Sequence, residues 1–178
     1  MSTFLAIDFE TANPDANSAC AIGLVLVTDG EVVSKTMRLI RPPSRDFFFT
    51  NVHGLTWDDV ADEPDFPRVW ADIAPLFDGV DFVAAHNVRF DRRVLFACCE
   101  TYGLLKPEAD FVCTVHVARA MWDLRPTGLA HCARFLCVPL DHHEALSDAH
   151  ACAQIVIAAE IDGWRGPRAN ARKFFGRF

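Results

Sequence analysis

The chain has 178 residues, of which 51% are hydrophobic, so its length and composition suit one ordinary domain with its own core. Its formal net charge is −7. That charge excludes an affinity built on broad phosphate neutralisation along a duplex, which needs many lysines and arginines facing the backbone. Any contact with nucleic acid is therefore expected to be local.

The seven cysteines do not indicate a disulfide framework, because their number is odd and two of them are adjacent. The sequence contains no CxxC pair. We expect reduced thiols that pack as small apolar side chains, in particular Cys113, Cys132, Cys137 and Cys152.

The first ten residues, MSTFLAIDFE, contain no basic region, and no later apolar run is long enough to span a bilayer. The prediction is a cytoplasmic protein without a membrane partner.

Three strands are predicted at the start of the chain, over residues 3–9, 19–27 and 31–40. Asp29-Gly30, between the second and third strands, is a favoured two-residue hairpin turn. An antiparallel arrangement of these strands follows.

Helix signals come next. Thr56 and Asp59 have the spacing of a capping box, and Asp65 is placed to cap a second helix with apolar residues every three or four positions. A β-α-β unit then follows, and helices end the chain. The expected ranges are strand 81–86, helix 88–101, strand 111–114 and helices near 115–122, 128–136 and 147–161.

No repeat, linker or low-complexity segment divides the sequence. The order of elements predicts an α/β fold with a mixed five-stranded sheet, three antiparallel strands followed by β-α-β, and helices on both faces.

Two acidic residues of the first strand are the first candidates for chemistry. Asp8 and Glu10 are two positions apart, so their side chains project from one face of the strand, with Phe9 on the other. Neighbouring carboxylates repel each other unless a cation lies between them, and oxygen ligands suit Mg²⁺ or Mn²⁺. The alternative is a strand end whose carboxylates face water.

Asp148 shares the apolar face of the last helix with Cys152 and Ile155. A carboxylate there needs a partner, either an arginine, a backbone amide, or a divalent ion shared with the first strand. Asp91 opens the helix after the fourth strand, where a carboxylate also favours the positive end of the helix dipole. His143 is expected in the loop before Asp148.

Three ordered motifs, DFET (8–11), AHNVRFD (85–91) and HHEALSDA (142–149), resemble those of the DEDDh (DnaQ-like) 3′-to-5′ exonucleases, a family that includes polymerase proofreading subunits. Segments 85–95 and 111–122 are most similar to the exodeoxyribonuclease X branch, and VHGLT (52–56) resembles a linking segment of the family. The family spacing His-x4-Asp selects His143 over His142, and Glu144 stands where the tyrosine branch has tyrosine.

The resemblance implies a ribonuclease H-like fold and two Mg²⁺ or Mn²⁺ ions. Asp8, Glu10 and Asp148 would hold one ion, Asp8 would bridge to the second, and Asp91 would support the second through water. His143 would take a proton from the attacking water, a task that histidine performs most often among side chains. The implied substrate-binding residues are Phe9, Thr11, His86 and Asn87. For Phe9 core packing is the alternative, and for Asn87 it is shaping of the loop.

The implied partner is the 3′ end of a single strand, DNA in preference to RNA, degraded to nucleoside 5′-monophosphates. The alternatives are an RNA 3′-trimming enzyme, a subunit that proofreads for a polymerase, a catalytically silent nucleic-acid-binding module and a ribonuclease H-type endonuclease. The predicted exonuclease domain covers residues 1–162. Residues 163–178 form a basic tail that is either a solvated end or a contact with nucleic acid or a protein. Its basic residues are Arg165, Arg168, Arg172, Lys173 and Arg177.

Overall fold

The computed structural model describes residues 1–167 and has a five-stranded sheet in the order β3-β2-β1-β4-β5. The strands are β1 (Thr3–Thr11), β2 (Ala19–Thr28), β3 (Glu31–Leu39), β4 (Phe82–Ala85) and β5 (Phe111–Cys113). The first three pair antiparallel, while β4 pairs parallel with β1 and β5 pairs parallel with β4. The predicted mixed sheet is confirmed.

The hairpin between β2 and β3 turns at the predicted pair of residues. Asp29 and Gly30 have φ angles of 52° and 83°. Positive φ at both central positions is what a two-residue type I′ turn requires, and its twist matches that of the flanking strands.

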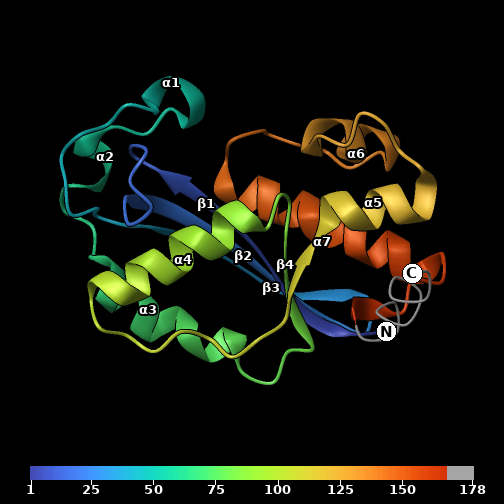
Figure 1. The fold of residues 1–178 in the computed structure, drawn as a ribbon. Coiled ribbons are helices and arrows are strands. Elements are labelled where there is room, and N and C mark those ends of the chain that lie inside the picture. The colour runs from blue at the N-terminus through green and yellow to red at the C-terminus, as the bar shows by residue number, and fades with distance from the viewer. Residues whose placement is uncertain (168–178) are drawn as a thin grey trace, which may run out of the picture.

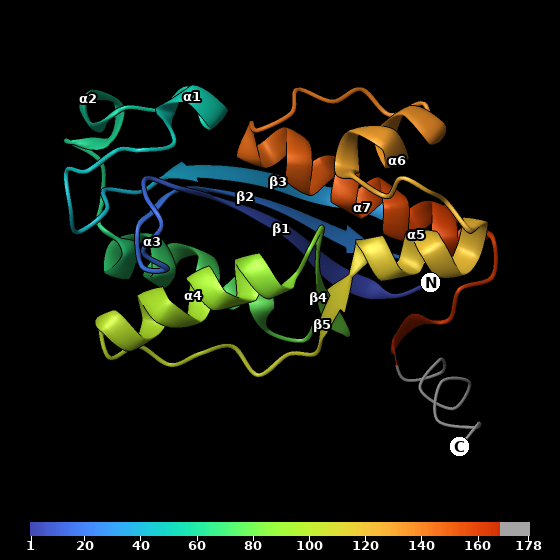
Figure 2. The same ribbon diagram turned by 45° about the horizontal axis from the view of Figure 1, so that its top comes forward.

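Helices cover both faces of the sheet, as predicted (Figure 1). They are α1 (Thr50–His53), α2 (Trp57–Val60), α3 (Phe66–Ile73), the 3₁₀ turn η1 (Ala74–Phe77), α4 (Arg89–Thr101), α5 (Thr114–Trp122), α6 (Leu129–Phe135) and α7 (Ala145–Ile161). Figure 2 shows α3 and α4 below the sheet and α5, α6 and α7 on the opposite side. None of the helices in residues 1–167 is long and apolar enough to cross a membrane.

Alternate residues of β1 enter two separate cores. Leu5, Ile7 and Phe9 pack in the core that contains residues of α3 and α4. Phe4 and Ala6 pack in the core with residues of α5 and α7. Because side chains alternate along a strand, the row of Phe4 and Ala6 continues into Asp8 and Glu10, which therefore face α7.

Two helix starts follow the predicted caps. Asp59 accepts a hydrogen bond from the Thr56 backbone N–H at 2.7 Å, and Asp65 accepts one from Arg68 N–H at 3.4 Å. The four-residue helix α1 was not predicted. It is too short to show periodicity, and the chain before it is held by tertiary contacts such as Phe48 N–H to the Ala12 carbonyl at 2.7 Å.

All seven cysteines are free thiols, in agreement with the prediction. The buried ones are Cys20, Cys98, Cys99, Cys132 and Cys152. Cys113 is half-buried. The prediction of core packing is wrong for Cys137, which is exposed in the turn after α6 with a φ of 56°.

The end of the described chain packs on the domain. Trp164 lies edge-on to Phe82, with ring centroids 5.6 Å apart, two residues after the predicted domain boundary at 162. Of the basic residues in the predicted tail, Arg165 lies within the described chain. Four lie outside the described residues: Arg168, Arg172, Lys173 and Arg177.

Candidate active site

Asp91 is tied to the end of β1 by a backbone hydrogen bond. Pairing of β1 with β4 stops at Ala6, so the edge of β1 beyond it has no strand partner on that side. Asp91, in the first turn of α4, fills this gap: its Oδ1 accepts a hydrogen bond from Phe9 N–H at 3.0 Å. The contact places the Asp91 carboxylate close enough to Asp8 for the two charges to repel each other.

Asp148 reaches β1 because α7 begins directly on the sheet. Gly23 of β2 lies opposite Asp8 in the strand register. A Cβ atom at Gly23 would stand 2.1 Å from the Ala145 carbonyl oxygen, so only glycine admits the first turn of α7 here. Carboxylate oxygens of Asp8, Glu10 and Asp148 consequently lie within 4.8 Å of one another.

Replacing Gly23 with alanine should force the start of α7 away from β2 and move Asp148 with it. We expect a loss of roughly 1–3 kcal/mol in stability from overpacking and a fall in kcat of about 10², the cost of misplacing a reacting group by about 1 Å. The matched control is Gly128→Ala, since a Cβ there meets nothing within 4 Å and its φ is −65°. Equal activity of the two variants in a steady-state assay would show that this close approach does not position Asp148.

Within residues 1–167 the basic side chain bonded to the acidic cluster is that of His142, on Asp148. Asp91 and Asp148 are 1% and 3% exposed, and within the described part of the chain Asp91 Oδ2 and Asp148 Oδ1 have no hydrogen-bond partner. The ion pairs of residues 1–167 include no lysine or arginine bound to these carboxylates. Buried carboxylate oxygens in this state need a cation or a proton.

The pKa values of three of the four acids reflect this environment. Burial, followed by repulsion from Asp148 and Asp91, raises the pKa of Glu10 to about 8. Burial raises the pKa of Asp91 to about 7, and burial with the charges of Asp91 and Asp148 raises that of Asp8 well above its ordinary value. The donors are hard oxygens, so the group fits Mg²⁺ or Mn²⁺.

This electrostatic arrangement predicts a pH-dependent stability without metal. Glu10 titrates near 4.5 in the unfolded chain and at about 8 in the folded one, so the folded state holds a proton that the unfolded state releases. Stability is therefore fully present below pH 4.5 and is lost as pH rises through about 8. Calorimetry in EDTA should show a lower Tm at pH 8 than at pH 6, by at least about 2–4 °C, the shift that 1 kcal/mol produces in a domain of this size. In Glu10→Gln the difference should shrink, and an undiminished difference in that variant would contradict the assignment.

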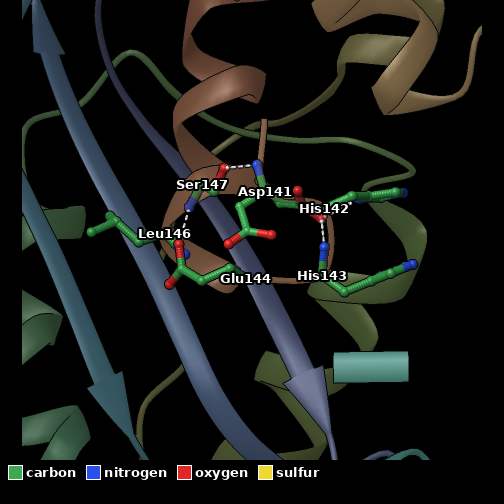
Figure 3. Close-up of polar contacts among 7 residues, drawn as sticks. Asp141, His142, His143, Glu144, Leu146 and Ser147 are labelled. Atoms are coloured by element: carbon green, nitrogen blue, oxygen red, sulfur yellow. Dashed lines mark hydrogen bonds and ion pairs between the residues drawn. The ribbon is translucent and has the colours of Figure 1, made fainter. Parts of the chain in front are cut away.

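Two histidines precede α7 and both contact Asp148. His142 Nδ1 lies 2.8 Å from Asp148 Oδ2, and the backbone N–H of His143 donates to the same oxygen at 3.1 Å. Their rings stack with centroids 3.9 Å apart and extend in the same direction in Figure 3. His143 has a φ of 72°, a left-handed conformation that turns the chain into the helix.

The helix start itself is fixed by its neighbours, as Figure 3 shows. Glu144 caps α7 by accepting hydrogen bonds from Leu146 N–H at 3.2 Å and Ser147 N–H at 2.7 Å. Ser147 Oγ in turn accepts one from Asp141 N–H at 2.8 Å. These contacts hold both histidines and Asp148 in one short, well-defined turn.

The acids and histidines border one cavity of about 430 Å³. Its apolar wall is formed by side chains from three separate segments: Phe49, Val52, Phe90 and Leu129. The remaining lining residues are Asp8, Phe9, Glu10, Thr11, His53, His86, His142, His143 and Asp148. Asp91 does not line the cavity; its Oδ1 accepts the hydrogen bond from Phe9 N–H.

The four residues predicted to bind substrate differ in position. Phe9 borders the cavity, but its ring is only 2% exposed and belongs to the α3–α4 core. Thr11 and His86 line the cavity. Asn87 is exposed, does not line it, and has a φ of 66° in the turn before α4. Its position fits the loop-shaping alternative.

His86 is a structural link at the cavity edge. Its Nε2 lies 2.9 Å from the Thr127 carbonyl oxygen, to which it must donate, and its Nδ1 lies 2.9 Å from Thr114 Oγ1. Burial lowers the pKa of His86, which favours the neutral ring. Both ring nitrogens are thus engaged by protein.

His53 was not predicted as a site residue. Its Nδ1 accepts from Leu55 N–H at 3.1 Å, so its Nε2 donates to the Thr11 carbonyl at 3.1 Å. This bridge fastens the α1 wall of the cavity to the end of β1. The VHGLT segment drew attention to this region, but no local pattern indicates that its histidine reaches a residue 42 positions away.

Comparison with known proteins agrees with this arrangement. The exonuclease family RNase_T matches residues 5–156. Exodeoxyribonuclease 10 of Escherichia coli K12 is 32% identical over 155 residues, covering 80% of this chain and 63% of that protein. The PolC-type DNA polymerase III of Thermotoga petrophila is 27% identical over 161 residues, covering 88% of this chain but only 12% of the polymerase.

Solved structures show the same fold. Exonuclease X in complex with 5′ overhanging duplex DNA has a TM-score of 0.72 at 26% identity, covering 91% of this chain and 94% of that one. The nuclease domain of 3′hExo, a DEDDh family member bound to rAMP, has a TM-score of 0.79 at 18% identity, covering 91% and 93%. The fold, the ordered acidic motifs and the family match together show that the chain belongs to the DEDDh (DnaQ-like) 3′-to-5′ exonuclease family.

Proposed function

We propose that this chain is a metal-dependent exonuclease that hydrolyses single strands from the 3′ end and prefers DNA. The observation that carries the proposal is the cluster of largely buried carboxylates, to which no lysine or arginine of residues 1–167 is bound, beside a cavity of about 430 Å³. A cluster of this kind costs stability unless cations bind it, which supports a functional role for it.

Asp8, Glu10 and Asp148 are the residues proposed to hold Mg²⁺ or Mn²⁺, since their oxygens already lie within 4.8 Å of one another. Asp91, whose Oδ1 accepts a hydrogen bond from Phe9 N–H, is proposed to support a second ion. When bound, such ions polarise a phosphodiester and stabilise the charge that develops on the attacking and leaving oxygens.

His143 is proposed to accept the proton of the attacking water at a ring nitrogen. It lines the cavity, and its backbone is fixed to Asp148 at 3.1 Å. The side chain that contacts Asp148 is His142, so the choice of His143 rests on the family spacing and not on this hydrogen bond. Attack by water at the terminal linkage would release a nucleoside 5′-monophosphate and leave a new 3′-hydroxyl.

The apolar wall of the cavity is suited to a nucleobase. Phe49 and Phe90 offer ring faces or edges, and Val52 and Leu129 complete the surface. Bases separated from a strand stack on such side chains with little sequence preference. The wall and the carboxylates lie on the same cavity, which suits recognition of one terminal nucleotide at a time.

The preference for DNA rests on exodeoxyribonuclease 10, at 32% identity, and on exonuclease X in complex with duplex DNA, at 26% identity. The likeness to 3′hExo, at 18% identity, extends to the fold alone. The match to a PolC-type polymerase is the observation that favours the second candidate, a proofreading role beside a polymerase.

The test is incubation of matched 5′-labelled DNA and RNA oligonucleotides with the protein and Mg²⁺ or Mn²⁺, beside the variant Asp8→Ala. A ladder that shortens from the 3′ end, faster on DNA than on RNA and absent from the variant, is the expected result. Faster shortening of RNA would replace DNA by RNA as the substrate. Cleavage of a circular single strand would indicate an endonuclease and contradict the proposal.

A further inference from the structure

The turn before α7 and the first turn of that helix contain a second group of potential metal ligands, which shares Asp148 with the carboxylate cluster. We propose that His142, His143 and Asp148 form an inhibitory site for Zn²⁺ and similar imidazole-preferring transition-metal ions. One ligand atom from each of these residues lies within 4.8 Å of the others. Metal binding rests on this geometry alone, whereas inhibition rests also on the proposed exonuclease function.

The geometry needs little change to hold an ion. His142 Nδ1 and Asp148 Oδ2 are already 2.8 Å apart, and the stacked rings of His142 and His143 diverge by 14°. Ligand atoms about 2.0–2.2 Å from a tetrahedral ion lie about 3.4 Å from one another. The separations of up to 4.8 Å must therefore shorten, and the stacked rings must turn to face one ion. The ion would take the place of the hydrogen in the His142–Asp148 hydrogen bond, and a neutral His142 would then carry its ring proton on Nε2.

The ligand set decides which ion binds. Two imidazoles and one carboxylate favour Zn²⁺ and its neighbours among the transition metals, whereas three carboxylates favour Mg²⁺ or Mn²⁺. Asp148 is 3% exposed, and its Oδ1 has no partner in the described part of the chain, so this side chain still lacks a cation after bonding His142. His142 is exposed and His143 is half-buried, so an ion from solvent can reach both rings.

Occupation of this site would stop the proposed reaction in two ways. A ring nitrogen of His143 bound to Zn²⁺ has no free lone pair with which to accept a proton from water. Asp148 belongs to both ligand groups, so binding it to the histidines would withdraw it from Asp8 and Glu10. The loss of the His143 lone pair would inhibit the reaction even where excess Mg²⁺ competes for Asp148.

The experiment measures Zn²⁺ binding to the full chain by competition with a chromophoric chelator, without Mg²⁺ and without nucleic acid. His142→Asn should weaken Zn²⁺ binding by at least about tenfold, the minimum cost of disturbing a ligand set. Glu10→Gln should leave Zn²⁺ binding within about twofold of the wild type while it weakens Mn²⁺ binding. His116→Asn, at an exposed position on α5, is the matched control and should bind Zn²⁺ as the wild type does.

Three outcomes would contradict the proposed Zn²⁺ site. Undiminished Zn²⁺ binding by His142→Asn is the first, and loss of Zn²⁺ binding in Glu10→Gln is the second, because that ion would then occupy the carboxylates. The third is a sulfur-to-metal charge-transfer band with Co²⁺ as the probe, which would place the ion on exposed Cys137 or another thiol. Zn²⁺ binding that disappears with His142, in a protein without Mg²⁺-dependent exonuclease activity, would retain the site and refute the proposed function instead.

Discussion

Asp8→Asn should lower kcat by at least about 10³ while raising the Tm of the metal-free protein. The loss follows because metal ions contribute several kcal/mol of transition-state stabilisation, and each 1.36 kcal/mol corresponds to a factor of ten. The gain follows because burial, and then the charges of four other acids, raise the pKa of Asp8; the four are Asp91, Asp148, Glu10 and Glu144. Asparagine keeps the shape and removes the charge. Steady-state kinetics with Mn²⁺ and calorimetry in EDTA measure the two effects.

The opposite signs separate a catalytic role from a structural one. A residue needed only for folding would lose activity and stability together. Asp72→Asn, an exposed acid on α3, removes the same charge far from the cavity and should change neither quantity by much. Activity within tenfold of the wild type in Asp8→Asn would remove this carboxylate from the mechanism.

His143→Ala should lower kcat by roughly 10² to 10⁴, the usual contribution of a general base. KM should change little, because the cavity wall that holds the nucleotide is formed by other side chains such as Phe49 and Phe90. His142→Ala, in the neighbouring position of the same turn, is the matched comparison and should cost less.

The comparison of these two variants decides the assignment. His142 is bonded through its side chain to Asp148 at 2.8 Å, and His143 through its backbone at 3.1 Å. Unchanged turnover in His143→Ala together with inactivity in His142→Ala would move the role of base to His142. The exposed His116 serves again as a control for loss of an imidazole.

Much of the fold could be predicted because its signals are local. Asp29-Gly30 specifies the hairpin, Thr56 with Asp59 and Asp65 specify helix starts, and all five strands were found at their places. Helix α1 was missed because contacts with β1 and the chain after it hold it, not periodicity. Cys137 was misplaced because a mainly apolar neighbourhood does not reveal a left-handed turn.

The positions of the acidic residues could be predicted from the sequence, whereas most contacts that build the cavity around them could not. Asp8 and Glu10 follow from strand alternation, and the burial of Asp148 follows from its helix face. The bond from Phe9 N–H to Asp91 and the bridge by His53 join distant segments, which no spacing rule detects. Gly23 had a readable signal, since an isolated glycine within a strand often marks a close backbone approach.

Removal and return of the metal tests the central claim most directly. A 5′-labelled single-stranded DNA is incubated with the protein after dialysis against EDTA, and then again after excess Mn²⁺ is added. We expect no shortening in EDTA, recovery of a 3′-shortening ladder with Mn²⁺, and no recovery in Asp148→Asn. Shortening in EDTA at the rate seen with Mn²⁺ would contradict a carboxylate site that works through bound metal.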